Sequence, residues 1–332
     1  MDASSYVITE EKRKLFDKLL ELLQEFDRVC RENEITYYAS GGTLLGAVRH
    51  GGFIPWDDDV DVILPRADYE KLKTVAGSGG ANGRGAFSEP FFFQNPSTDE
   101  GYPKGFSRLR NSNTAEIPYD DVAMNCNRGI FIDIFPLDYA PEDGAAFQKK
   151  IRTLRRIRMF LNCYARYYSG FGCESTTGIK KLAYYCMVPL FRMKLLTADR
   201  MFQRLEKEAA GYGHGGSPCR KWGTLTGTFD EPRFIYDTAL FDGEAVLMPF
   251  ETMRVPVPSG YHAMLTHVYG DYMTPVQAPT EHGDMLYSTT QPYGEFIRQH
   301  AAELKQGWLK QTEIGRRNRQ SMSGRQDKQS KI

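Results

Sequence analysis

Several features that mark common classes of protein are missing from this sequence. Its 332 residues carry 42 Lys and Arg against 42 Asp and Glu, so the basic excess that a dedicated nucleic-acid binder needs is absent. There is no apolar run of the roughly 18 residues that a transmembrane helix requires, and the N-terminal segment does not resemble a signal peptide. The six cysteines are scattered without a CxxC pair, which argues against a zinc site. We therefore expect a cytoplasmic protein with reduced thiols.

Alternating helical and extended patterns predict a mixed fold. Apolar side chains recur with the helical period over residues 10–32, and Thr9 is a suitable N-cap. Short apolar runs over residues 35–40, 105–111 and 129–135 predict strands. Hydrophobic residues make up 41% of the chain and aromatic residues 13%, which is enough to fill a core. The expected fold class is α/β (α+β), a mixed sheet flanked by helices.

Changes in composition divide the chain into four parts. The segment after residue 143 is rich in Lys, Arg, Leu, Met and Tyr and predicts two or three helices. Short strands and turns return from about residue 222, with a helix near 260–268, and large apolar residues almost disappear from about Thr312. The predicted parts are an α/β core (1–143), a helical insertion (144–221), a C-terminal part of the core domain (222–311) and a disordered tail (312–332).

The sharpest chemical feature is a run of carboxylates in the extended block from Trp56 to Leu64. If the block is a strand, Asp59 and Asp61 point to one face, whereas Asp58 points to the other. Close carboxylates repel one another, and Mg²⁺ or Mn²⁺ would relieve that repulsion. A solvated acidic turn and the D-x-D motif of a glycosyltransferase are alternatives. An EF-hand is disfavoured, because valine stands where its loop needs glycine.

A further carboxylate lies in the almost wholly apolar segment from Ile130 to Phe135. A charge on Asp133 in such a strand is costly unless it is paired or coordinated. Because the acidic block lacks a third ligand, we expect Asp133 to complete a metal site with Asp59 and Asp61. Pairing with an arginine, or capping a turn, is the alternative.

The segment Gly41-Gly42-Thr43 follows the first predicted strand and begins a predicted helix. That geometry presents backbone N–H groups to a phosphate. The segment is not a P-loop, because the Lys-Ser/Thr pair is missing, and it is not a G-x-G-x-x-G dinucleotide motif. Its position one strand before the D-x-D pattern makes it a candidate phosphate site.

Four cationic residues are further candidates for phosphate binding. Arg108 and Arg110 alternate onto one face of the predicted strand 105–111, where they would bind phosphate or form an ordinary solvated face. Arg49 and His50 follow the Gly-Gly helix, where they would contact substrate or make a structural hydrogen bond. Near the end of the chain, Asp271 is either a substrate contact or a helix cap.

The predicted helical insertion begins with a strongly basic helix. One interpretation of this charge is an ordinary solvated helix face. The more specific alternative is contact with an anionic membrane surface. The apolar segment Leu182–Leu196, flanked by lysines, favours the second interpretation. The basic residues of the first helix are Lys149, Lys150, Arg152, Arg155, Arg156 and Arg158.

The stretch from Tyr38 to Val62 closely resembles the signature of the LicD family, which transfers phosphocholine and related phospho-alditols and includes the fukutin-related proteins. Three further segments resemble blocks of that family in the expected order, and the similarity runs from about residue 13 to 290. These segments are Arg66–Tyr69, Gly129–Asp138 and the Y-G-D-Y sequence Tyr269–Tyr272.

The resemblance implies a nucleotidyltransferase-like fold and a metal-dependent phosphotransferase. Its expected reaction moves a phospho-alcohol group from a CDP-linked donor to a hydroxyl of a cell-surface glycan precursor and releases CMP. The acceptor is free or lipid-linked, and in the second case the protein would work at the inner face of the membrane. The implied catalytic and metal-binding residues are Asp59, Asp61 and Asp133, with Gly41, Gly42, Thr43, Arg49, Arg108 and Arg110 around the donor.

Three other functions remain open at this stage. A nucleotidyltransferase proper would use the same carboxylates and release pyrophosphate, and a D-x-D glycosyltransferase would release a nucleoside diphosphate. A metal-stabilised binding protein would turn nothing over. No recognisable motif identifies the transferred alcohol, which is choline, ribitol, glycerol or another. No motif identifies the oligomeric state.

Overall fold

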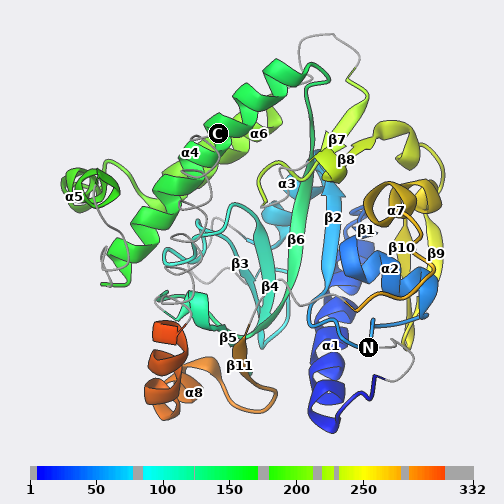
Figure 1. The fold of residues 1–332 in the computed structure, drawn as a ribbon, viewed down its shortest axis with the longest axis horizontal. Helices are drawn as coiled ribbons and strands as arrows, with labels where there is room; N and C mark the ends of the chain where they lie inside the picture. Colours follow the sequence, from blue (N-terminus) through cyan, green and yellow to red (C-terminus); the bar gives the residue numbers. More distant parts are fainter. Residues whose placement is uncertain are drawn as a thin grey trace, which may run out of the picture.

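A mixed β-sheet lies at the centre of the molecule (Figure 1). The computed structural model describes residues 6–77, 85–122, 124–170, 179–211, 219–227, 232–277 and 284–310. The main strand order is β1 (Tyr38–Ala39), β2 (Asp61–Pro65), β6 (Ile130–Tyr139), β4 (Ser107–Asn111) and β3 (Phe91–Gln94). β2 and β6 run parallel, and the other neighbouring pairs in this order are antiparallel. The predicted α+β fold class is therefore confirmed.

The N-terminal helix α1 (Glu10–Glu32) covers one face of this sheet (Figure 1). It begins where the sequence predicts, and the Thr9 hydroxyl caps it by accepting a hydrogen bond from the Lys12 amide at 3.2 Å. Its apolar face is buried in the main core against the sheet. The buried side chains of α1 are Leu15, Phe16, Leu19, Leu22, Leu23, Phe26, Val29 and Cys30.

Two short helices flank β2 in the sequence. α2 (Gly41–Arg49) follows β1, and α3 (Arg66–Val75) follows β2. Arg66 donates two hydrogen bonds to the buried carboxylate of Asp138 on β6, at 2.8 and 2.7 Å, and one to Glu206 at 3.2 Å. This ion-pair group joins the start of α3 to the far end of β6.

Three helices follow β6 and form a separate hydrophobic cluster. They are α4 (Gly144–Tyr168), α5 (Ile179–Arg192) and α6 (Ala198–Ala210). α4 and α6 pack side by side, and α5 lies farther out from the sheet (Figure 1). The insertion therefore contains the expected helices, while the predicted division of the chain into domains stays a prediction.

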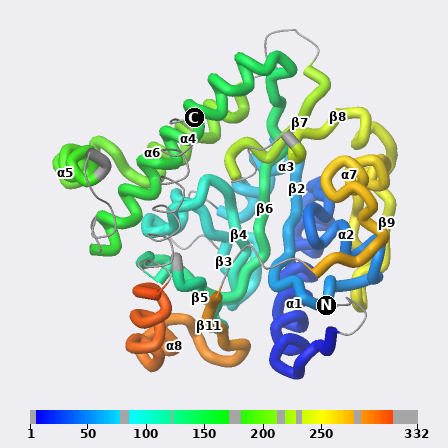
Figure 2. Tube along the Cα trace, in the orientation of Figure 1, coloured from blue at the N-terminus to red at the C-terminus, as the bar shows by residue number. Residues whose placement is uncertain are grey.

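Later segments return to the central sheet and to the N-terminal half. Figure 2 shows α7 (Tyr261–Tyr269) and β9 (Val246–Phe250) close to α2, although more than a hundred residues separate them in sequence. β9 pairs with β10 (Met253–Val257), and β11 pairs with β5. The remaining elements are β5 (Ala115–Pro118), β7 (Lys221–Gly223), β8 (Ile235–Asp237), β11 (Met285–Ser288), α8 (Tyr293–Gln299), and the 3-10 turns Tyr119–Asp121, Pro232–Phe234 and Thr238–Phe241.

Some predicted boundaries were wrong. The strand expected over 35–40 is only Tyr38–Ala39, and the one expected over 56–64 begins at Asp61. Residues 57–60 instead form an irregular segment that leads into β2, and the regular pairing with β6 begins at Asp61. Repulsion between the crowded carboxylates disfavours a regular strand before that point. The predicted tail lies outside the described residues.

Candidate active site

A cavity of about 510 Å³ opens beside the ends of β2 and β6. The start of α2, the acidic segment before β2, and the strands β4 and β6 each contribute to its wall. Segments from the C-terminal half close the other side with Thr224, Tyr236 and the Y-G-D-Y region. Of the residues predicted from the sequence, Gly41, Gly42, Arg49, Asp59, Asp61, Arg108 and Asp133 line this cavity.

Two of the predicted carboxylates are fixed by the register of the sheet. Asp61 on β2 pairs directly with Asp133 on the parallel strand β6. Arg108 on β4 pairs with Asp133 from the other side. Cross-strand partners point to the same face of a sheet, so these three side chains form a row along one face.

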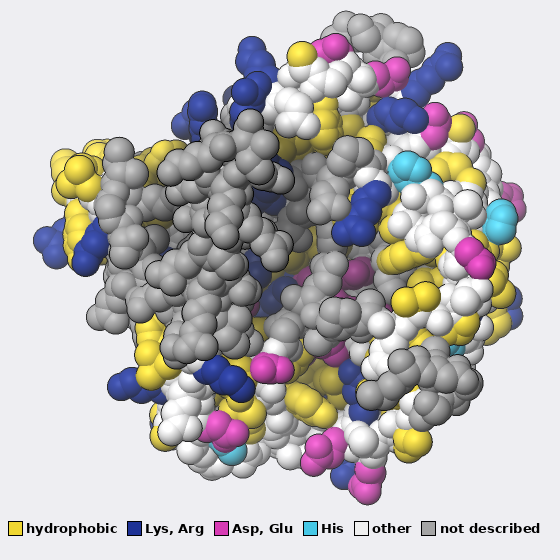
Figure 3. Space-filling model, in the orientation of Figure 1, with side chains coloured by type: hydrophobic (Ala, Val, Ile, Leu, Met, Phe, Trp, Pro, Cys, Tyr) yellow, Lys and Arg dark blue, Asp and Glu magenta, His cyan; other side chains and the backbone are white. Residues whose placement is uncertain are grey.

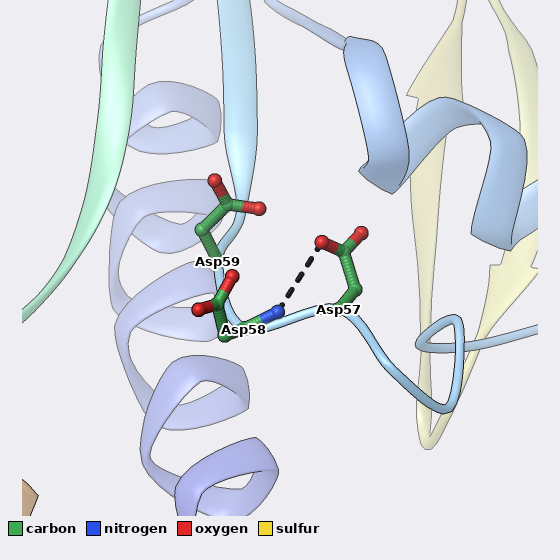
Figure 4. Close-up of side chains that lie close together, drawn as sticks. All are labelled: Asp57, Asp58 and Asp59. Atoms are coloured by element: carbon green, nitrogen blue, oxygen red, sulfur yellow. Dashed lines mark hydrogen bonds between the residues drawn. The ribbon is translucent and has the colours of Figure 1, made fainter. Parts of the chain in front are cut away.

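The remaining carboxylates lie in the segment before β2. Figure 4 shows Asp57, Asp58 and Asp59 gathered at this turn, with the Asp58 amide donating a hydrogen bond of 3.2 Å to Asp57 Oδ1. Each of the three offers an oxygen, and these oxygens lie within 4.8 Å of one another. Asp59 lies before β2 and not on the strand, but it lines the same cavity as Asp61, as its predicted orientation requires. It still lies close enough to Asp61 and Asp133 to feel their charges.

The electrostatics of this group favour a bound cation. Burial raises the pKa of Asp59 well above its usual range, and the charges of Asp61 and Asp57 raise it further. Burial, followed by the charge of Asp58, raises the pKa of Asp57 to about 6. Clustered carboxylates that resist ionisation in the metal-free chain are a donor set that suits a hard divalent ion such as Mg²⁺.

Asp133 has a different local partner. Arg108 Nε donates to Asp133 Oδ1 at 2.5 Å and Nη2 donates to Oδ2 at 3.2 Å, and both side chains are buried. The arginine alternative for Asp133 is therefore present in the structure. Both carboxylate oxygens of Asp133 are therefore already engaged by one guanidinium group.

The carboxylates leave no room for a side chain at the two glycines that begin α2. Gly41 has φ of +53°, and a Cβ there would lie 2.7 Å from Asp61 Oδ2. A Cβ at Gly42 would overlap Asp57 Oδ2. The Thr43 hydroxyl accepts a hydrogen bond of 2.9 Å from the Asp61 amide and does not line the cavity. Thr43 therefore positions β2 against α2, and the glycines let the helix start approach the carboxylates.

Part of the chain is similar to known proteins. Residues 34–156 match the family model described as LicD/FKTN/FKRP, nucleotidyltransferase domain. The chain carries a LicD-family domain. The lipopolysaccharide cholinephosphotransferase LicD of Haemophilus influenzae is 26% identical over 264 residues, which cover 76% of this chain and 88% of that protein. The ribitol 5-phosphate transferase FKRP of Homo sapiens is 43% identical over 44 residues, which cover 13% of this chain and 9% of that protein.

The LicD-family match ends before several residues that complete the cavity. Arg49 Nη1 donates to the Tyr272 carbonyl at 2.7 Å, so the helix after Gly41-Gly42 is tied to the Y-G-D-Y region. Tyr269 and Asp271 line the cavity there, and the Thr274 hydroxyl donates to Asp271 at 2.7 Å. Gly270, and not Asp271, is the C-cap of α7, so the helix-cap alternative for Asp271 was wrong.

Arg110 does not reach the cavity of the LicD-family domain. Its guanidinium donates to Gln94 Oε1 and, at 2.7 Å, to the Gly129 carbonyl. Arg108 and Arg110 both lie over the ring of Phe131, as expected for side chains on one face. Both are buried, so the solvated-face interpretation was wrong, and Arg110 supports the sheet instead of lining the site.

Lys104 and Thr224 are among the polar residues in the wall of the cavity that sequence reasoning missed. Lys104 lies just before β4 and lines the cavity near Arg108. Thr224 follows β7, is buried, and its hydroxyl has no hydrogen-bond partner within the described ranges. Neither position belongs to a motif, and Thr224 is brought to the site only by the pairing of β7 with β6.

Proposed function

We propose that this protein transfers a phospho-alcohol group from a CDP-linked donor to a hydroxyl of a cell-surface glycan precursor, with release of CMP. The observation that carries the proposal is the row formed by Asp61, Asp133 and Arg108. This row and the first two residues of α2, Gly41 and Gly42, line one cavity of the LicD-family domain. The relatives named for cholinephosphate and ribitol 5-phosphate transfer support the reaction class. A cytoplasmic location is part of the same proposal.

The proposed cofactor is Mg²⁺ or Mn²⁺. Asp59, Asp61 and Asp133 would hold it, and Asp57 and Asp58 lie close enough to add charge or a further ligand. The raised pKa of Asp59 fits this assignment, because a cation would compensate both the burial and the carboxylate repulsion that raise it. When bound, the ion would neutralise charge on the diphosphate during phosphoryl transfer.

The residues of the chain would mainly orient the donor and stabilise the negative charge on its phosphates. Backbone N–H groups at Gly41 and Gly42 lie in the first turn of α2, where helical partners are missing, and both residues line the cavity, so they would bind the non-bridging oxygens. Arg108 and Lys104 supply positive charge on the opposite wall, and the Thr224 hydroxyl supplies a hydrogen-bond donor. Such positioning and electrostatic stabilisation provide most of the catalysis in phosphoryl transfer.

The bond changes of the proposed reaction are simple. The acceptor oxygen attacks the phosphorus that carries the alcohol, and the bond from that phosphorus to the CMP oxygen breaks. CMP leaves with the electron pair, and the acceptor hydroxyl loses its proton to a base.

Product analysis with the purified chain tests the proposal. The panel contains Mg²⁺ with CDP-choline, CDP-ribitol, CDP-glycerol, CTP, ATP and UDP-sugars, each with soluble and lipid-linked glycan acceptors. We expect CMP release from one CDP-alcohol, lost in Asp59→Asn and kept in the exposed control Asp242→Asn. Pyrophosphate release would instead indicate nucleotidyl transfer, and a nucleoside diphosphate would indicate glycosyl transfer.

A further inference from the structure

Helix α5 has an apolar surface on the side that faces away from the protein. Its buried face consists of Tyr184, Met187 and Phe191, which pack into the cluster with α4 and α6. The opposite face is also apolar, and it is exposed. The members of this exposed stripe are Leu182, Cys186 and Pro189 on α5 and Met193 directly after it, which have the i, i+4, i+7, i+11 spacing of a single helix face. The Met193 amide donates to the Pro189 carbonyl at 2.9 Å, so Met193 continues the helical pattern.

The exposure of this stripe is large. Leu182 is 64% exposed and Met193 is 67% exposed, and Tyr185, Leu190 and Leu195 nearby are exposed as well. An ordinary surface helix buries one apolar face and presents polar residues on the other. A helix that is apolar all round, with only one face covered by its own protein, needs a second apolar partner.

The segment of the chain that contains the stripe is rich in positive charge. In a chain whose net charge is zero, the segment between Asp143 and Asp199 has eleven basic residues and one acidic residue, Glu174. Figure 3 shows Lys and Arg side chains beside the hydrophobic ones at the edge of the molecule where α5 lies. The basic residues are Lys149, Lys150, Arg152, Arg155, Arg156, Arg158, Arg166, Lys180, Lys181, Arg192 and Lys194.

The placement of α5 leaves this surface accessible. α5 is the outermost of the three helices that follow β6 and lies away from the central sheet (Figure 1). Lys181, Arg192 and Lys194 are exposed at its two ends. Among the described helices, none has the length and apolar character needed to cross a bilayer. An apolar stripe with basic ends and too few residues to span is the pattern of a helix that lies in the membrane interface.

We propose that the exposed face of α5 binds the surface of an anionic lipid bilayer. Leu182 and Met193 would enter the acyl boundary, and the basic residues at the ends of α5 would contact the negatively charged headgroups. This proposal goes beyond the transferase function and does not depend on it, because vesicle binding needs neither donor nor acceptor. If both hold, the cavity would work on acceptors that are carried by membrane lipids.

Vesicle sedimentation with the full chain tests the proposal. We expect the protein to sediment with vesicles of phosphatidylcholine and phosphatidylglycerol, to stay in solution with phosphatidylcholine alone, and to be released by high salt. The double substitution Leu182→Gln with Met193→Gln should weaken binding roughly tenfold or more. Leu247→Gln on β9 is the matched control, because Leu247 is also exposed and apolar but lies far along the chain from α5.

Three results would overturn the proposal. The first is a parent protein that binds neither type of vesicle. The second is a double variant that binds as the parent does while its thermal unfolding midpoint is unchanged. The third is a parent dimer, measured by light scattering, that becomes a monomer in the double variant, because a second copy would then cover α5. Should the double variant fail to fold, Lys181→Glu with Arg192→Glu gives the same test at exposed positions.

Discussion

Asp61 and Asp133 are direct register partners on the parallel strands β2 and β6. Neither carboxylate can change its height along the sheet without a slip of the strand pair, which would turn every neighbouring side chain to the other face. The backbone of Asp133 is held further by a hydrogen bond of 2.8 Å from its amide to the Val60 carbonyl. The proposed metal site therefore rests on one rigid strand pair and one acidic turn.

The first prediction separates the strand carboxylates from the turn. Asp61→Asn should weaken Mg²⁺ binding roughly tenfold or more, because it removes a proposed ligand. Asp58→Asn should have a much smaller effect, because Asp58 belongs only to the turn group. Calorimetric titration with Mg²⁺ measures both. A normal affinity in Asp61→Asn, with a large loss in Asp58→Asn, would move the site to the turn.

The second prediction concerns the buried pair of Arg108 and Asp133. Arg108→Met leaves the Asp133 charge buried without its partner and should lower the free energy of unfolding by about 3–5 kcal/mol. Arg108→Met combined with Asp133→Asn should recover part of this loss, since the uncompensated charge is gone. Urea unfolding gives both values. Equal stability of the single and double variants would show that the pair is not coupled.

The third prediction isolates the contact between Gly41 and Asp61. Gly41→Ala and Gly51→Ala both place alanine at a positive φ, of +53° and +68°, and each should lose about 1 kcal/mol of stability. At Gly41 the new methyl group also meets Asp61, whereas at Gly51 no atom lies within 4 Å. Transfer activity should therefore fall strongly in Gly41→Ala and stay close to the parent value in Gly51→Ala. Similar activities in the two variants would contradict this contact.

The fourth prediction follows from the raised pKa of Asp57. A carboxyl group whose pKa is higher in the folded than in the unfolded chain stabilises the fold below its ordinary value of 3.8. That stability is lost as the pH rises through about 6 in the absence of metal. Mg²⁺ should bind the ionised form, so it should raise the unfolding midpoint more at about pH 7.5 than at about pH 5. Scanning calorimetry at both pH values checks this, and an equal effect of Mg²⁺ would contradict it.

The fifth prediction tests the cationic wall of the cavity. Lys104→Met should raise the KM for the CDP-linked donor by roughly tenfold with a smaller change in kcat, because Lys104 would bind the diphosphate before and during transfer. Lys305→Met removes an exposed lysine near the end of the described residues, away from the cavity lining, and serves as the control. Steady-state kinetics with varied donor separates the two parameters. An unchanged KM would remove Lys104 from the proposed donor site.

Much of the fold was predictable because its signals are local. The period of α1 and its Thr9 cap are read from adjacent residues, and the apolar run that contains Asp133 indicates a strand without further information. Motifs identified the two glycines at the start of α2 and the carboxylates, and the fold brings both groups to one cavity. Asp59 was placed on the wrong type of element, because strand alternation cannot reveal where the ladder begins.

The residues that were missed or misplaced depend on long-range pairing. Arg110 has the same strand parity as Arg108, yet Gln94 on the neighbouring strand and the Gly129 carbonyl hold its guanidinium away from the cavity. Thr224 joins the wall through a strand pair that links positions more than eighty residues apart. Sequence patterns describe one segment at a time, so they do not report which neighbour captures a side chain.

The close fit of Gly41 and Gly42 against the carboxylates has an evolutionary consequence. The space that a side chain at position 41 would need is filled by Asp61, and the space at position 42 is filled by Asp57. The residues allowed at positions 41 and 42 therefore depend on the residues at positions 61 and 57, although the two segments are separate in the sequence. Among homologues, a larger residue at either glycine should appear together with a shorter or lost carboxylate opposite it, so a paired change there would mark a lineage that has abandoned the reaction.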